Sequence, residues 1–361
     1  MTALSSPGWS VRTGTRASTL AAIVAWAILA LGFAAPLFLS RGAIQDLFFI
    51  FTMLTLAQCW NLLAGYTGLV SVGQQAFVGL GAYALFGTVI LLGLDPLWGI
   101  LLAGVLAVLL AIPTAFFVFR LAGAYFAIGT WVIAEVVRLL LAQWRALGGG
   151  TGTSLPPAAV RDMTGVSWVA DLFGVRAAQA ADILCYWLAL ALAAGTIFGI
   201  LSLLRSRRGL GLAAMRDNPL AASAIGVDPT RMKAGVYLAA AFVTGLTGAL
   251  IYLRTARISP DAAFSVTDWT AYVIFIVVIG GIGTIEGPIV GVLVFFLLRT
   301  ALADWGSWYL LVLGALGIAV MLFAPRGLWG LVSARTGLEL FPVRRILAGP
   351  IPRKDTTHGG D

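Results

Sequence analysis

The sequence predicts an all-α membrane protein, a polytopic helical bundle of about ten spans with Gly-rich broken or re-entrant segments. Of its 361 residues, 60% are hydrophobic and only 11% are charged, whereas soluble domains usually carry about 25% charged residues. Because so few charges cannot cover a water-facing surface, lipid must cover much of it. The 43 glycines fit membrane helices whose backbones approach closely.

The spans are predicted from apolar segments, since a helix needs about 20 mostly apolar residues to cross a bilayer. Such segments lie at residues 19–39, 45–65, 77–93, 97–118, 121–142, 182–204, 234–254, 269–284, 288–303 and 308–324. The third, eighth and ninth are short, which predicts tilted, broken or partly re-entrant helices. The first apolar run is long for a cleaved signal peptide, so we expect it to remain as a span.

The distribution of basic residues predicts the orientation. When the N-terminus is placed inside, most of the 23 Lys and Arg residues fall on the inner side of the membrane. Basic residues favour cytoplasmic loops, so both termini are expected in the cytoplasm. This topology also accounts for the net charge of +8 without a nucleic-acid partner.

One membrane domain accounts for most of the chain. The predicted organisation is a cytoplasmic N-terminal segment (residues 1–18), a transmembrane domain (residues 19–325) and a cytoplasmic tail (residues 326–361). A basic loop at about 205–233 is predicted on the inside. A Gly- and Pro-rich connection at 143–181, dominated by turn signals, is predicted on the outside.

The residue inventory argues against an enzyme. The single histidine, His358, lies in the polar tail, and Cys59 and Cys185 lie in apolar runs, so neither a metal site nor a Ser-His-Asp triad is expected. The only lysines, Lys233 and Lys354, do not follow a phosphate-binding loop, so the chain is not expected to hydrolyse ATP. No cofactor is predicted.

Polar side chains interrupt a stretch at membrane depth, residues 61–83. Its Asn, Thr, Ser and Gln side chains must face protein or a wet cavity, because unsatisfied polar groups in hydrocarbon cost several kcal/mol. One interpretation is a pore-lining element that passes a small polar solute. The other is a Gly-packed helix pair whose polar groups bond to neighbouring helices.

This stretch reads N-L-L-A-G-Y-T-G-L-V-S-V-G-Q-Q-A-F-V-G-L-G-A-Y, and it resembles the motif of the LivH/LivM family of permeases, in particular its LivM type. The matching positions are Asn61, Gly65, Gly68, Ser71, Gly73, Gln74, Phe77, Gly81, Ala82 and Tyr83. Gln74 occupies a place where His is also common. The resemblance implies that these residues, together with Gln75, line or shape a translocation path.

A short helix is predicted within the basic loop. Asn218 suits the N-cap, Pro219 the first helical position and Gly226 the position just after the end. A short helix with an Ala face suits insertion into a groove on another protein. The alternative is an ordinary loop helix that lies on the membrane surface.

The loop reads A-M-R-D-N-P-L-A-A-S-A-I-G-V, which resembles the ATPase-coupling loop of the same family. The matching residues are Arg216, Asp217, Asn218, Ala221, Ala222 and Gly226, and Pro219 stands where Glu is frequent. The resemblance implies that this helix docks in a cleft on a separate ATPase subunit.

A third Gly-rich phrase follows. Gly283, Gly287 and Gly291 are spaced by four, so they fall on one face if a helix continues through them. Pro288 is expected to break or kink that helix. Glu286 is expected at an aqueous interface; the alternative is a functional carboxylate. The phrase G-G-I-G-T-I-E-G-P also resembles the LivH/LivM family.

Glu135 and Arg138 lie three residues apart in one predicted span. Ionisable residues at membrane depth are costly and usually paired. A structural ion pair is the favoured interpretation, and a pair that contacts a zwitterionic solute is the alternative.

The resemblance implies a permease subunit of an ATP-driven importer in the bacterial inner membrane, for branched-chain amino acids or related small polar solutes. Its implied partners are a LivH-type permease, LivG/LivF-type ATPases that bind the ATP, a periplasmic solute-binding protein and membrane lipid. A stand-alone transporter or channel would instead need buried carboxylates for a coupling ion, and a membrane enzyme would need a reactive cluster at depth.

Overall fold

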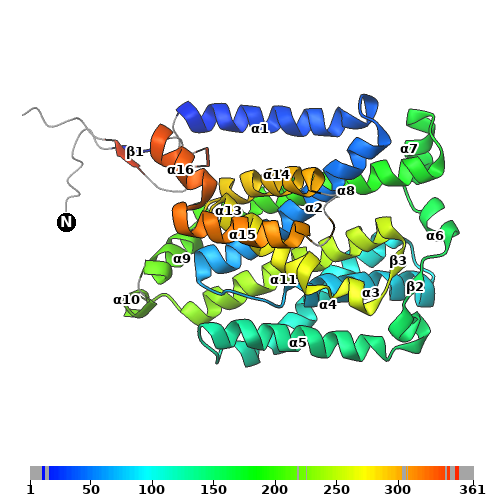
Figure 1. Ribbon diagram of the computed structural model, residues 1–361, viewed down its shortest axis with the longest axis horizontal. Coiled ribbons are helices and arrows are strands. Elements are labelled where there is room, and N and C mark those ends of the chain that lie inside the picture. Colours follow the sequence, from blue (N-terminus) through cyan, green and yellow to red (C-terminus); the bar gives the residue numbers. More distant parts are fainter. Residues whose placement is uncertain are drawn as a thin grey trace, which may run out of the picture.

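The computed structural model describes residues 10–12, 16–217, 219–224, 226–302, 306, 308–337, 340–341 and 346–348. Long helices run side by side along the longest axis of the molecule (Figure 1). Helices α9 (Arg207–Asp217), α10 (Pro219–Ala224) and α16 (Gly327–Thr336) lie at one end, called here the α10 end. Helices α6 (Pro157–Arg161) and α7 (Val166–Phe173) lie at the opposite end, the α6 end.

Each of the predicted apolar segments coincides with a helix. These are α1 (Arg16–Ala34), α2 (Arg41–Asn61), α3 (Gln74–Leu92), α4 (Pro96–Val118), α5 (Ala124–Ala142), α8 (Ala177–Arg205), α11 (Pro229–Thr255), α13 (Tyr272–Gly280), α14 (Glu286–Ala301) and α15 (Trp308–Phe323). Within the described residues, 8 stretches are long and apolar enough to cross a membrane. The apolar part of the first segment, Ala22–Leu37, and the 16-residue α14 are shorter.

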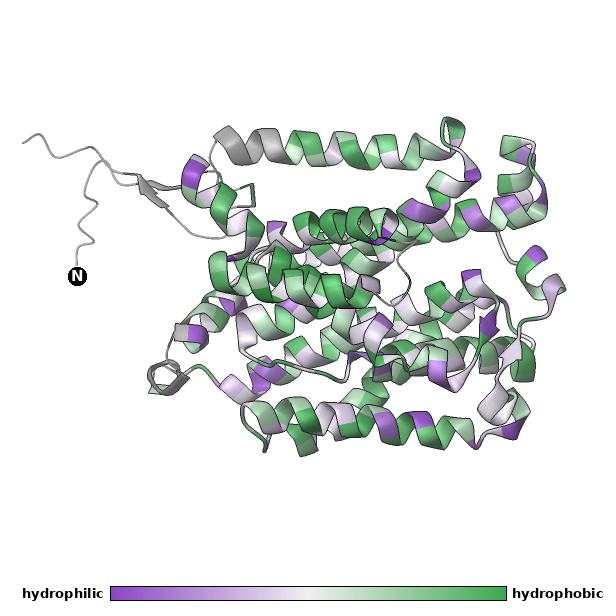
Figure 2. Cartoon of the chain, viewed as in Figure 1, coloured by the Kyte–Doolittle hydropathy of each residue, from purple (hydrophilic) through white to green (hydrophobic). Residues whose placement is uncertain are grey.

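Large apolar side chains are exposed along the sides of the bundle. Examples are Trp26 on α1, Leu140 on α5 and Phe323 on α15. Hydrophilic residues gather mainly toward the two ends (Figure 2). So much exposed apolar surface suits the lipid of a membrane, and the helices are long enough to cross it, so this is an all-α polytopic membrane protein, as the sequence predicts.

Several spans begin at an N-cap residue that lies at one end of the bundle. The Asp95 side chain accepts a hydrogen bond from Leu97 N at 2.8 Å, with Pro96 in the first helical position of α4. Asp228 accepts from Thr230 N at 3.0 Å and starts α11 in the same way. Such caps satisfy N–H groups that have no partner in the first turn.

Glycines allow the central helices α3, α4 and α11 to touch through their backbones. A Cβ atom on Gly81 would lie 2.2 Å from the carbonyl oxygen of Gly245, and one on Gly248 would lie 2.2 Å from that of Val78. Gly245 in turn packs against Ala103 of α4. This close packing of small residues forms the centre of the bundle.

Two non-helical connections between neighbouring helices are called breaks here. Helix α2 continues as the π-helix η2 (Leu62–Tyr66) and is followed, after Thr67, by a non-helical stretch, residues 68–73, in which Gly68 has φ +72°. The chain also leaves the helix between α13 and α14, at a turn formed by residues 281–285, where Gly283 has φ +78°. The eighth and ninth predicted segments therefore correspond to α13 and α14, which this turn separates, whereas the third predicted segment is the continuous 19-residue helix α3.

The helix does not continue through Gly283, Gly287 and Gly291, so the three do not share one face, and the interruption expected at Pro288 lies instead at residues 281–285. Gly283 lies in the turn, and Pro288 lies in the first turn of α14, where its missing N–H costs no helical hydrogen bond. Gly287 and Gly291 do form a seam, but with α13. A Cβ on Gly291 would lie 1.9 Å from the carbonyl oxygen of Ile276.

Several short elements at the bundle ends were not predicted. At the α6 end, β2 (Thr153–Ser154) pairs antiparallel with β3 (Arg257–Ile258), and α12 (Pro260–Ala263) follows. The remaining elements are η1 (Ala35–Leu37), η3 (Arg145–Leu147), η4 (Gly149–Thr151), η5 (Thr267–Ala271) and the pair β1 (Ser10–Arg12) with β4 (Ile346–Ala348). Helices α7, α9 and α16 are too short to give a strong periodic signal.

Candidate functional site

The two breaks meet inside the bundle, where Asn61 joins them. Its Oδ1 accepts a hydrogen bond from Gly283 N at 2.7 Å, and its Nδ2 donates to the carbonyl oxygen of Thr284 at 2.8 Å. One helical turn earlier, Gln58 Nε2 donates to the carbonyl oxygen of Ile285 at 2.7 Å. We call residues 58–66, the 281–285 turn and the side chains that touch them the break junction.

The turn needs these amides because its backbone has left the helix. Unpaired backbone groups within a membrane protein cost several kcal/mol each. Asn61 is 1% exposed and offers one acceptor and one donor in the right places. A Cβ on Gly65 would lie 2.7 Å from Gly283 N, so only glycine lets the two breaks approach this closely.

A residue of the basic loop also reaches the break junction. Arg216 projects from the end of α9, and a Cβ on Gly283 would lie 3.1 Å from its Nη1 and 3.4 Å from its Nη2. The guanidinium therefore lies directly against the turn. Arg216 is nevertheless exposed, and its role in coupling to an ATPase, which the family resemblance implies, stays a prediction.

Glu286, the first residue of α14, is buried at the α10 end. Its Oε1 accepts hydrogen bonds from the backbone N–H groups of Leu340 at 3.1 Å and Phe341 at 2.8 Å. The expectation that Glu286 lies at an aqueous interface is wrong because the tail covers it. The carboxylate ties the tail to the helix that follows the second break.

The other polar residues of the first motif are also buried and bonded to protein. Gln74 Nε2 donates to the carbonyl oxygen of Leu56 at 2.9 Å, and Gln75 Oε1 accepts from Thr270 Oγ1 at 2.5 Å. Trp60 Nε1 donates to the carbonyl oxygen of Ser71 at 2.8 Å. These contacts are those that the helix-packing interpretation describes.

Phe77, Gly81 and Tyr83 of this motif are also enclosed, whereas Gly68 is exposed. Tyr83 is fully buried with its hydroxyl unbonded among the described residues, and the ring of Phe77 packs edge-on against Tyr237 with 5.7 Å between centroids. Gly81 lies in the crossing of α3 with α11. The pore-lining role of the motif stays a prediction.

The segment that resembles the ATPase-coupling loop, residues 216–226, is called the coupling segment here, and it contains the short helix α10 with a cap at its C-terminal end. Gly226 has φ +87°, its N–H donates to the carbonyl oxygen of Ser223 at 3.1 Å, and Val227 N donates to that of Ala222 at 3.1 Å. This is the Schellman pattern, with glycine in the left-handed position that the sequence predicts. Asn218, expected as the N-cap, lies outside the described residues.

The C-terminal half of the coupling segment shows which of its residues face the chain's own core and which face outward. Ala222 is 1% exposed and packs into an apolar cluster of its own chain, whereas Ala224 and Gly226 are exposed at the α10 end. Ala222 therefore supports the helix from within rather than facing outward. The side chains of Asp217, Pro219 and Ala221 lie outside the described residues.

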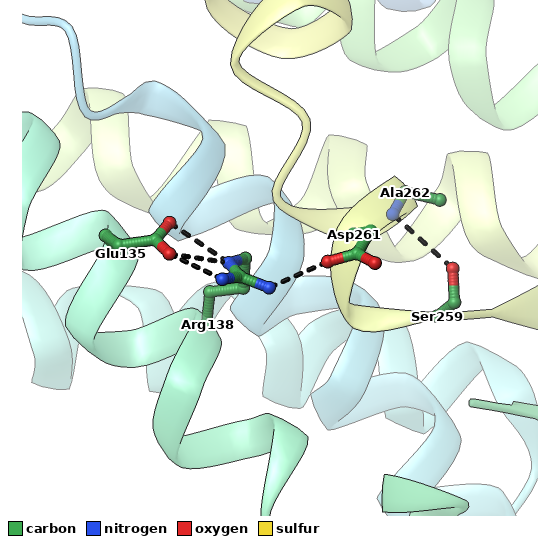
Figure 3. Close-up of polar contacts among 5 residues, drawn as sticks. All are labelled: Glu135, Arg138, Ser259, Asp261 and Ala262. Atoms are coloured by element: carbon green, nitrogen blue, oxygen red, sulfur yellow. Dashed lines mark hydrogen bonds and ion pairs between the residues drawn. The ribbon is translucent and has the colours of Figure 1, made fainter. Parts of the chain in front are cut away.

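The Glu135–Arg138 pair has a third member that the sequence did not indicate. Arg138 Nε donates to both carboxylate oxygens of Glu135 at 3.0 Å, and Nη1 donates to Asp261 Oδ1 at 2.7 Å (Figure 3). Ser259 caps α12 by accepting from Ala262 N at 3.4 Å and so helps to position Asp261. One arginine between two carboxylates fits a structural role that ties α5 to α12.

Comparisons with known proteins agree with the motifs. Residues 43–321 match the family model described as "Branched-chain amino acid transport system / permease component". The chain is 30% identical over 316 residues to the high-affinity branched-chain amino acid transport system permease protein LivM of Salmonella typhimurium, which covers 84% of this chain and 73% of the relative. The LivM protein of Escherichia coli gives the same values. No solved structure gives a significant match.

Proposed function

The chain belongs to the family of branched-chain amino acid transport system permease components, and from this premise we propose that it is one permease subunit of an ATP-driven importer. The subunit pairs with a LivH-type permease in a bacterial inner membrane, and the two line a path for branched-chain amino acids or related small polar solutes. The α10 end faces the cytoplasm and the α6 end faces the periplasm.

Separate ATPase subunits of the LivG/LivF type bind and hydrolyse the ATP and dock at the α10 end. The chain itself is a non-catalytic subunit without a cofactor. A periplasmic solute-binding protein docks at the α6 end, near the Gly-rich turn at residues 148–152 and the short strands β2 and β3.

The observation that carries this proposal is the contact of Arg216 with the 281–285 turn. Arg216 is the last basic residue before the exposed end of the coupling segment, and the turn that it touches is bonded to Asn61. A displacement of α9 and α10 by an ATPase therefore acts on both breaks together. Because helix breaks are where a packed bundle yields most easily, this route converts ATPase closure into alternating access.

A stand-alone ion-coupled transporter finds less support in the structure. It would need a carboxylate at depth that binds and releases its coupling ion. Of the carboxylates in the sequence motifs and their partners, Glu135 and Asp261 are bonded to Arg138 and Glu286 is bonded to the tail backbone. We therefore keep the importer as the proposed function.

The proposal is tested with the substitution Ala224→Arg, which places a large charged side chain on the exposed end of α10. We expect the tagged chain to copurify with the second permease but to lose the ATPase subunits and ATP-dependent uptake. Ala158→Arg is the matched control for ATPase copurification, because Ala158 is an exposed alanine on α6 at the opposite end; uptake is not compared for this control, because the binding protein is proposed to dock at that end. If the wild-type chain purifies alone and transports in liposomes without ATP, the proposal is wrong.

A further inference from the structure

Two adjoining cavities of about 570 and 580 Å³ open between α2, α11, η5, α13 and α14. Both are lined by Phe49, Arg254 and Arg299, so we treat them as one outer cavity. Their volumes lie in the range of small-molecule sites. None of the predicted site residues lines the outer cavity.

The outer cavity begins near the α6 end and reaches inward along α2. Asp46 lines it in an early turn of α2, and Met53 lines it seven residues later, which corresponds to a depth of about 10 Å. Arg254 and Arg299 belong to the last turns of α11 and α14. A solute that enters from the periplasmic side would meet this cavity first.

The charged groups of the outer cavity are incompletely paired. The guanidinium of Arg299 lies over the Phe49 ring, 4.1 Å from its centroid, and it makes no ion pair with a carboxylate among the described residues. Arg254 lies 5.1 Å from the centroid of Phe48, and its ion pair with Asp182 is long at 3.9 Å. Both arginines thus keep donor capacity for a ligand.

A negative group faces the same cavity from η5. The backbone N–H of Asp268 is bonded to Ser265, but its carboxylate makes no hydrogen bond or ion pair among the described residues. η5 is a π-helix, an irregularity that is frequent at functional sites. Trp269 lies beside it, donates from Nε1 to the carbonyl oxygen of Ala262 at 2.8 Å, and adds an aromatic wall.

We propose that the outer cavity binds a small zwitterion, an amino acid with an apolar side chain, as the first site of the translocation path. Arg299, assisted by Arg254, binds the carboxylate through the planar, two-pronged geometry that suits this group. Asp268 binds the ammonium group, and the rings of Phe49 and Trp269 contact the apolar side chain. This inference rests on the proposed function and adds its solute-binding site.

The test measures equilibrium binding of radiolabelled L-leucine to the assembled complex in nanodiscs without binding protein. We expect Arg299→Gln to weaken leucine binding at least tenfold, the loss typical of one charge-assisted contact. Arg299→Lys should keep part of the affinity, because it keeps the charge but not the two-pronged geometry. Unchanged leucine affinity in Arg299→Gln would overturn the proposal.

Two competitors separate the roles of the charges. 4-Methylpentanoate lacks the ammonium group, so its competition should depend on Arg299 and not on Asp268. 3-Methylbutylamine lacks the carboxylate, so Asp268→Asn should abolish its competition while Arg299→Gln leaves it unchanged. Equal effects of both substitutions on both competitors would contradict the assignment.

Arg161→Gln is the matched control, because Arg161 lies on α6 and pairs with Asp162 outside the cavity. It should keep wild-type leucine affinity. An Arg299→Gln effect that disappears when anionic lipids are replaced by phosphatidylcholine would assign the cavity to a lipid headgroup and overturn the inference. Copurification of the ATPases is scored in the same samples, so a failure of the importer proposal is distinguishable from a failure of this site.

Discussion

At the scale of residues, Asn61 shows how one side chain can hold two helix breaks together. Its amide offers an acceptor to Gly283 N and a donor to the carbonyl oxygen of Thr284. A carboxylate would lack the donor, and an apolar side chain would lack both groups. This polar residue in an apolar span therefore satisfies the backbone hydrogen-bonding groups of a turn that lies 222 residues further along the chain.

Asn61→Leu is expected to destabilise the protein, because it keeps the approximate volume but leaves two buried backbone groups unpaired. Each unsatisfied group costs about 1–3 kcal/mol. The measurement is thermal unfolding in detergent, followed by fluorescence-detected size exclusion. Gln179→Leu on α8 serves as control, since the side chain of Gln179 is only partly buried. An unfolding midpoint for Asn61→Leu equal to that of the control would contradict the bonded role of Asn61.

At the scale of elements, the crossing of α3 and α11 depends on the absence of side chains. Gly81 and Gly248 each face a backbone carbonyl of the other helix at a distance that no Cβ atom tolerates. Backbone cannot move aside as a flexible side chain can, so a methyl group at this crossing must push the helices apart. Because the first motif includes both the break and this crossing, its glycines set the spacing that the break junction requires.

Gly81→Ala is therefore expected to destabilise the bundle by about 1–3 kcal/mol, the usual cost of overpacking. Gly87→Ala in the same helix is the control. Its Cβ would have only ordinary contacts, 3.8 Å from Leu147 and 3.9 Å from Trp144, so it should be neutral or stabilise by about 0.5–1 kcal/mol. Comparison of the two unfolding midpoints checks the prediction, and equal midpoints would refute it.

At the scale of the whole molecule, α13 links the two functional regions. It follows η5, which lines the outer cavity, and it ends at the 281–285 turn, which contacts Arg216 and Asn61. In the proposed importer, the same helix therefore connects the solute site at one end with the coupling loop at the other. This arrangement gives the proposed importer a continuous physical connection between its ligand and its source of energy.

The proposed orientation predicts opposite labelling of the two ends. Ala158→Cys on α6 should react with a membrane-impermeant maleimide in intact spheroplasts, and Ala334→Cys on α16 should react only in inverted vesicles. Both alanines are exposed, whereas the native Cys59 and Cys185 are buried and give little background. Reaction of Ala334→Cys in intact spheroplasts would reverse the assignment of the α10 end to the cytoplasm.

The sequence by itself determined the membrane class, the ten apolar segments, the helix stop at Gly226 and the Glu135–Arg138 pair. These features are local: a span is a length of apolar chain, a cap is a residue at a helix end, and an ion pair three residues apart lies on one helix face. The family resemblance follows from motifs that are continuous in the chain, and the comparisons confirm it.

Only the tertiary structure decided which distant groups meet. It bonds Asn61 to the turn at residues 281–285, adds Asp261 to the Arg138 pair, covers Glu286 with the tail, and forms the outer cavity around Arg299. The contacts at these sites are set by how the chain packs, and no local period in a sequence specifies a partner that is fifty or more residues away.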